Sequence, residues 1–130
     1  MTDYVAYHKA EVMGYDALDV AKLAIYTKKL ASAAIGSRVW IVAGVGSPRK
    51  YRLRATFLVK SIGSSDKPEF TNRVSGTDGQ LLDPMPFLNS ELWFPALLKA
   101  QGNFAFGFNA INDTAVQDGL RAVLRSASKP

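Results

Sequence analysis

Near both ends of the chain, apolar residues recur at every third or fourth position, as they do along one side of an amphipathic helix. The first such stretch predicts a helix over residues 17–29, which Asp16 can cap. The second predicts a C-terminal helix capped by Asp113, with its apolar stripe formed by Val116, Leu120, Val123 and Leu124. A shorter helix is expected over residues 95–101, because it opens on a proline and is followed by Gly102.

Between these helices the pattern favours strands. Residues 51–60 alternate most strictly, with apolar residues at the odd-numbered positions. The polar residues at the even-numbered positions are Arg52, Arg54, Thr56 and Lys60. We therefore expect a strand that turns one face to the core and a basic face to solvent. Compact runs of β-branched and aromatic residues predict further strands over residues 4–7, 38–43, 70–75 and 103–109.

The expected order is strand, helix, several antiparallel strands, short helix, strand and helix. This order defines an α+β domain, and a small, curved, mainly antiparallel β-barrel with helices at its rim would accommodate it. With 130 residues, 48% of them hydrophobic and 21% charged, the chain suits one globular domain spanning residues 1–130.

Positive charge is concentrated in the middle of the chain, whose net charge is +5. Residues 22–77 hold eleven Lys and Arg residues against two acids, whereas both flanking segments are slightly acidic. Such a block is typical of a surface that binds a polyanion, although it would also serve solubility alone. The phosphate contacts expected from charge and alternation are Arg49, Lys50, Arg52 and Arg54.

The sequence lacks the residues that several kinds of catalytic site require. The chain has no cysteine and a single histidine, His8, so thiolate chemistry and the usual zinc ligand sets are missing. Residues 44–48 lack the Gly-Lys-Ser/Thr of a phosphate-binding loop and are read as a hairpin. No pair of carboxylates has an obvious acid–base spacing. We expect no cofactor, no metal and no enzymatic activity; an enzyme assembled only by the tertiary fold is the least favoured alternative.

Targeting signals are also missing from the sequence. The N-terminus shows no secretory pattern, and the longest apolar run, residues 39–45, is far shorter than the ~18 residues of a membrane span. A bacterial or phage cytoplasm is therefore the expected location, without a membrane partner.

Three segments, residues 4–15, 36–44 and 93–107, resemble the N-terminal modules of some bacterial HNH endonucleases. Those modules are PUA-like, in the group that includes EVE and YTH domains. The resemblance implies a small curved barrel that reads modified bases in DNA or RNA by holding a flipped base in an aromatic pocket. It implies the pocket residues Trp40, Trp93, Asn103 and Phe104. The chain departs from those nucleases in having no His-Asn-His segment before Pro130.

The favoured function is accordingly a non-enzymatic module that binds DNA or RNA, alone or in association with a separate nuclease. The alternative is a small-molecule or peptide-binding module whose basic strand is only solvated surface.

Overall fold

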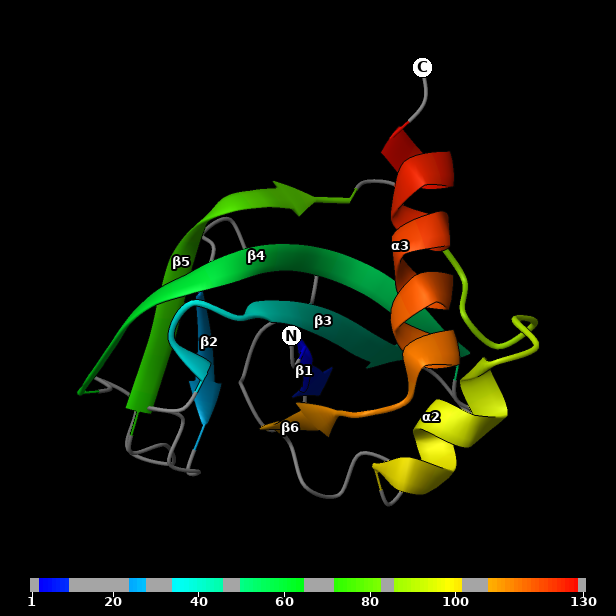
Figure 1. Cartoon of the computed structure of the whole chain (residues 1–130), viewed down its shortest axis with the longest axis horizontal. Coiled ribbons are helices and arrows are strands. Elements are labelled where there is room, and N and C mark those ends of the chain that lie inside the picture. The colour runs from blue at the N-terminus through cyan, green and yellow to red at the C-terminus, as the bar shows by residue number, and fades with distance from the viewer. Residues whose placement is uncertain are drawn as a thin grey trace.

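Six strands form one mixed sheet in the order β2-β5-β4-β3-β1-β6 (Figure 1). The computed structural model describes residues 3–9, 24–27, 34–45, 50–64, 72–82, 86–101 and 108–128. Its elements are β1 (Asp3–Lys9), β2 (Ala24–Thr27), β3 (Arg38–Val45), β4 (Lys50–Ser64), β5 (Asn72–Leu81), α2 (Phe94–Ala100), β6 (Phe108–Ile111) and α3 (Thr114–Ser128). All strand pairs are antiparallel except β1 and β3. The chain is thus an α+β protein, and its described strand pairs leave the sheet open between β2 and β6.

The two described helices lie where the sequence predicts them. Asp113 caps α3 as expected, because its Oδ1 accepts hydrogen bonds from the backbone N–H groups of Ala115 at 2.9 Å and Val116 at 3.4 Å. The apolar stripe of α3 faces the sheet, where Val116, Leu120 and Val123 are buried. Among the described helices, none is long and apolar enough to span a membrane.

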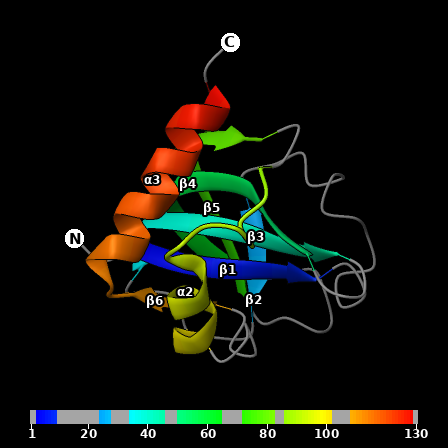
Figure 2. The same cartoon turned by 90° about the vertical axis from the view of Figure 1, so that its right-hand side faces the viewer.

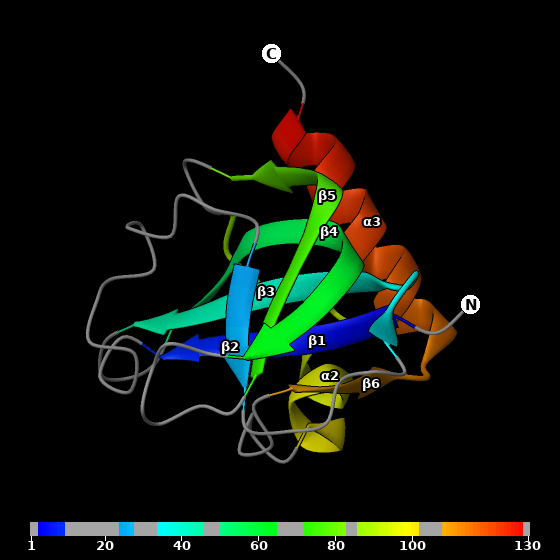
Figure 3. The same ribbon diagram turned by 90° about the vertical axis from the view of Figure 1, so that its left-hand side faces the viewer.

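The sheet buries apolar side chains on both of its faces. The helix-side core lies between the sheet and the two helices (Figure 2) and consists of Val5, Trp40, Val42, Leu53, Leu82, Leu88, Phe94, Leu97, Ile111, Val116, Leu120 and Val123. The inner core occupies the opposite face, over which β5 and β2 curl (Figure 3), and consists of Ala6, Ala34, Val39, Ile41, Ala55, Phe57, Val59 and Val74. Among the described elements, β5 and β2 cover this face through the curvature of the sheet.

A β-bulge makes one strand serve both cores. Val42 pairs with Leu53 and Ile41 pairs with Ala55, so Arg54 is an extra residue with no partner position on β3. Because the bulge reverses the alternation, Leu53 faces the helix-side core whereas Ala55 faces the inner core. Of the five residues predicted to face the core, Tyr51 is half-buried and the other four are buried, but they are divided between two faces.

The predicted outward position of Arg54 is therefore wrong. Its side chain is only 4% exposed, and its Nη1 donates a hydrogen bond to the carbonyl oxygen of Leu82 at 3.0 Å. Thr56 is buried as well, and its hydroxyl donates to the carbonyl oxygen of Val39 at 2.8 Å. The expected uninterrupted basic face of this strand does not exist, because Arg54 and Thr56 in its middle are buried.

The helix expected over residues 17–29 is wrong at residues 24–27, which form β2 and pair with β5. The segment contains Ile25, Tyr26 and Thr27, whose side chains favour strands, and pairing with an open sheet edge outweighs the helical spacing of its apolar residues. The remainder of that prediction lies outside the described residues. The strands predicted at residues 4–7, 38–43 and 51–60 are confirmed, and β5 includes the described part of the strand predicted at residues 70–75.

Candidate functional site

The segment before α2 is attached to the first residues of β4 by three hydrogen bonds. Leu53 N–H donates to the carbonyl oxygen of Pro86 at 3.0 Å, and Leu88 N–H donates to that of Tyr51 at 2.9 Å. The backbone N–H of Tyr51 donates to Oδ1 of Asn89 at 2.6 Å. This short strand-like attachment gives the segment an alternation of its own, so that Leu88 is buried whereas Phe87 is 49% exposed.

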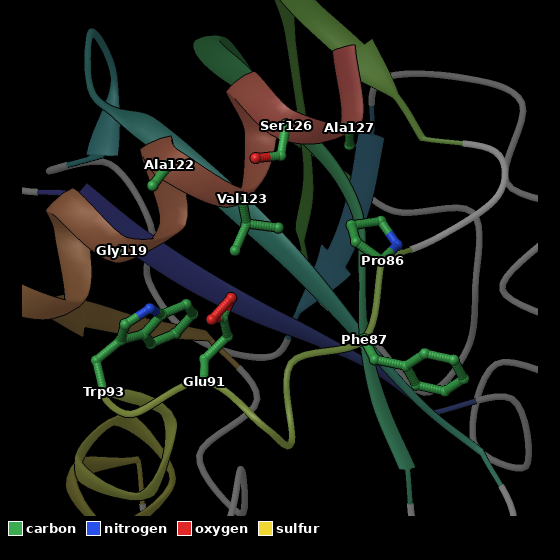
Figure 4. A pocket seen from close by; sticks show the side chains of 9 residues that line it. All are labelled: Pro86, Phe87, Glu91, Trp93, Gly119, Ala122, Val123, Ser126 and Ala127. Atoms are coloured by element: carbon green, nitrogen blue, oxygen red, sulfur yellow. The ribbon is translucent and has the colours of Figure 1, made fainter. Parts of the chain in front are cut away.

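An open groove lies between this segment and α3 (Figure 4), and its volume is about 380 Å³. We call it the Trp93 groove; it is lined by Pro86, Phe87, Glu91, Trp93, Gly119, Ala122, Val123, Ser126 and Ala127. Figure 4 shows the Glu91 carboxylate projecting into the groove between Trp93 and Val123, whereas the ring of Phe87 points away from it. The groove thus offers one large aromatic ring, one carboxylate and an apolar wall from α3.

Trp93 is held in place from two sides. It immediately precedes α2, and its ring contacts that of Phe94 edge to face, with centroids 6.2 Å apart and an interplanar angle of 71°. On the other side, a Cβ atom built on Gly119 would overlap the Trp93 indole. A glycine inside a helix costs about 1 kcal/mol relative to alanine, and here it lets the indole lie directly against the α3 backbone. Gly119 therefore determines how closely the Trp93 indole approaches the backbone of α3.

This contact predicts that the effect of Gly119→Ala on the free energy of unfolding changes sign when Trp93 is also replaced. Gly119→Ala should destabilise the wild-type protein, because the new methyl group displaces the indole. In a Trp93→Ala background the same substitution should raise the free energy of unfolding by up to about 1 kcal/mol, through helix propensity alone. Chemical denaturation of the four proteins measures both effects. Equal effects in the two backgrounds would show that Gly119 does not position Trp93.

A cationic surface adjoins the groove at Phe87. The guanidinium carbon of Arg52 lies 4.0 Å from the centroid of the Phe87 ring, and Nζ of Lys50 lies 6.0 Å from it. Neither cation forms an ion pair with any part of the chain that the structure describes. We call these three residues the Arg52 cluster. Within the described ranges its two charges have no acidic partner, and they lie beside the groove with Lys50 exposed and Arg52 half-buried.

The sequence-predicted site residues are thus separated by the fold. Arg49, Asn103 and Phe104 lie outside the described residues. Lys50 and Arg52 share the Arg52 cluster, and Trp93 lines the neighbouring groove. Arg54 is buried, so it cannot belong to the same surface. Trp40 is 0% exposed and its Nε1 donates a hydrogen bond to Oδ2 of Asp3 at 2.9 Å, which makes it a core residue and not a base platform.

Of the nine residues that line the groove, only Trp93 was predicted from the sequence as a site residue; the missed residues that shape the groove most are Glu91 and Gly119. Glu91 is one acid in a polar segment, and nothing in its spacing relates it to Trp93 until the turn before α2 forms. Gly119 interrupts a predicted helix, and an unexplained glycine there is the one signal that could have indicated a close contact.

Within the described ranges, no three His, Asp or Glu side chains lie close enough together to hold a metal ion. Comparison of the chain with models of protein families, with curated proteins and with solved structures finds no significant match.

Proposed function

We propose that this domain binds nucleic acid, with one unstacked base in the Trp93 groove and the adjoining phosphates on the Arg52 cluster. The observation that carries the proposal is the adjacency of an aromatic groove to two cations that form no ion pair with any described acidic side chain. Phosphate contacts by Lys and Arg give affinity and register, whereas a pocket for a base gives selectivity.

The groove has the features needed to receive a flat heterocycle. Its volume of about 380 Å³ lies within the range of roughly 300–1,000 Å³ that is usual for small-ligand sites. Trp93 supplies a π-surface, against which stacking is worth about 1–3 kcal/mol per base. The Glu91 carboxylate beside it can accept hydrogen bonds from the amino or imino groups of a base. A base presenting N–H donors should therefore be preferred.

The resemblance to PUA-like and EVE-like modules extends this proposal in two ways. The curved sheet would belong to such a barrel, and the groove would read a modified base after it flips out of the DNA or RNA strand. In such a role the domain itself cuts nothing, and a separate nuclease would supply any cleavage.

The experiment for the proposed function is a salt titration of oligonucleotide affinity. Arg52→Ala and Lys50→Ala should each weaken binding to every sequence alike and reduce the slope of log K against log[salt] by about 0.7 to 0.9. Lys60→Ala is the matched control, because Lys60 is exposed on the same strand but does not line the groove or the cluster. Salt-independent binding, or an equal loss from Lys60→Ala, would contradict the proposal.

A second candidate is a module that binds a cationic small molecule or a basic peptide, and Glu91 beside Trp93 favours it. Glu91→Gln separates the two candidates. The amide keeps an acceptor oxygen for a base, so nucleic-acid affinity should change little, whereas affinity for a cationic ligand should be lost with the negative charge.

A further inference from the structure

A second depression lies along the other flank of α3. Gly119 and Ala122 line the Trp93 groove, whereas Arg121 and Leu124 line this depression, whose volume is about 280 Å³. We call it the Arg38 depression, and its polar and aromatic lining consists of Arg38, Trp40, Thr56, Asp78, Gln80 and Arg121. The depression contains two guanidinium groups, and neither takes part in the proposed groove.

The guanidinium of Arg38 is held by neutral oxygen atoms only. Its Nη1 donates to the hydroxyl oxygen of Thr56 at 3.1 Å, and its Nη2 donates to the backbone carbonyl of Asp78 at 3.3 Å. Arg38 forms no ion pair with any described residue. These two bonds fix the orientation of the group and leave the rest of its five N–H donors for a ligand. Arg38 is thus a positioned cation that no described carboxylate contacts in an ion pair.

Arg121 is different, because its charge is compensated inside the protein. Its Nη2 lies 3.0 Å from Oδ2 of Asp3, a fully buried carboxylate that also accepts the Trp40 indole N–H. The Arg121 guanidinium carbon lies 5.9 Å from the centroid of the Trp40 ring. Because Asp3 holds it there while its side chain stays 39% exposed, Arg121 can add N–H donors at the edge of the depression.

One residue that lines the depression, Asp78, carries a negative charge that would repel a bound anion. The carboxylate of Asp78 is exposed at the depression, where the Thr77 hydroxyl donates to its Oδ2 at 3.3 Å. Arg38 contacts the backbone oxygen of Asp78 and forms no ion pair with this carboxylate. Asp78 has a φ of +54°, a conformation that Asp and Asn adopt more readily than most residues, so its backbone role explains why a short polar residue stands there.

We propose that the Arg38 depression binds a phosphate group, with Arg38 as the principal ligand and Arg121 as a second donor. The planar guanidinium fork suits two phosphate oxygens better than an ammonium group does. The binding of a phosphate group is argued from the residues of the depression alone. The further step, that this phosphate belongs to a nucleic-acid strand, rests on the proposed function. A helix is about 10–12 Å wide, and at about 3.4 Å of rise per nucleotide a strand would cross α3 from the groove in roughly three to four nucleotides.

The test titrates inorganic phosphate at constant ionic strength and follows the Nε–Hε resonances of Arg38 and Arg121 in the wild-type protein. In the Arg38 variants, which have no Arg38 Nε–Hε group, the titration is followed through Arg121, which also lines the depression. A saturable shift is expected, and it should vanish in Arg38→Gln and weaken at least tenfold in Arg38→Lys, which keeps the charge without the fork. Arg125→Gln is the matched control, because Arg125 is exposed on α3 and does not line the depression. Asp78→Asn should tighten phosphate binding by about twofold to fivefold, because it removes a repulsive charge at a backbone conformation that Asn tolerates.

The proposal is overturned if phosphate causes no saturable shift, or if Arg125→Gln reduces binding as much as Arg38→Gln does. A loss of binding counts only for variants whose amide spectra stay dispersed as in the wild type, and Asp78→Asn provides a gain that misfolding cannot imitate. The same site is then probed with a single-stranded oligonucleotide of eight residues. Phosphate binding without oligonucleotide binding would support the Arg38 depression and reject the proposed function. Oligonucleotide binding that depends on Arg52, with no phosphate shift at Arg38, would reject the depression alone.

Discussion

Trp40→Ala should lower the free energy of unfolding by about 3–5 kcal/mol, which is a large part of the roughly 5–15 kcal/mol that stabilises an ordinary domain. Trp40 is among the largest fully buried side chains, and it lies in the helix-side core beneath α3. Its removal leaves a cavity and takes one hydrogen-bond donor from the buried carboxylate of Asp3. Denaturant titration followed by circular dichroism measures the loss.

Trp40→Phe separates these two contributions. The phenyl ring retains most of the buried apolar area but lacks the indole N–H, so the carboxylate of Asp3 loses its neutral donor and keeps its ion pair with Arg121. We expect a loss of about 1–3 kcal/mol from the missing donor together with the smaller ring. If Trp40→Ala were nearly neutral and instead abolished ligand binding, Trp40 would be a ligand contact and its assignment to the core would be wrong.

Trp93→Ala should weaken binding to the preferred oligonucleotide by roughly 5- to 150-fold, because one stacking surface is worth about 1–3 kcal/mol. The loss should fall mainly on the preferred strand, so that selectivity decreases, whereas Arg52→Ala weakens binding to all strands alike. Fluorescence anisotropy with labelled strands of two sequences measures both affinities.

Trp93→Phe is the conservative control and should restore part of the affinity, since it returns a smaller aromatic face. Unfolding curves are needed for each variant, because Trp93 also packs against Gly119 and Phe94. Were Trp93→Ala to unfold the protein, or to bind every strand as the wild type does, Trp93 would not be the base platform. The cationic-ligand candidate would then be the stronger one.

Local sequence signals were sufficient for the two described helices, because a proline start and an Asp113 cap act within a few residues. The strict alternation of residues 51–60 also gave the correct strand, yet it could not show the bulge at Arg54. A bulge arises from the register against β3, which depends on residues ten or more positions away along the chain. Arg54 therefore looked solvent-exposed in a pattern that continued unbroken past it.

The candidate site was predictable only in part for the same reason. Lys50, Arg52 and Trp93 are distinctive by charge or size and could be named in advance. Their partners come from the turn before α2 and from the middle of α3, two segments that are distant in the sequence and are brought together only by the tertiary fold. Glu91 gave no local sign of its role, and Gly119 gave only the sign of being a glycine in a helix.

The position of β1 within the sheet has a consequence for the time course of folding. β1 lies between β3 and β6, and its register joins Tyr4 to Val39 on one side and Asp3 to Ile111 on the other. At a synthesis rate of about 5–20 residues per second, β6 is completed roughly 3–13 s after β3. During that interval β1 can pair with β3 alone. Sheets built on such distant pairings fold in milliseconds to seconds, so the wait on the ribosome can exceed the folding time itself. Until β6 arrives, one edge of β1 is open, and that interval is when a nascent chain is most exposed to pairing with the wrong strand.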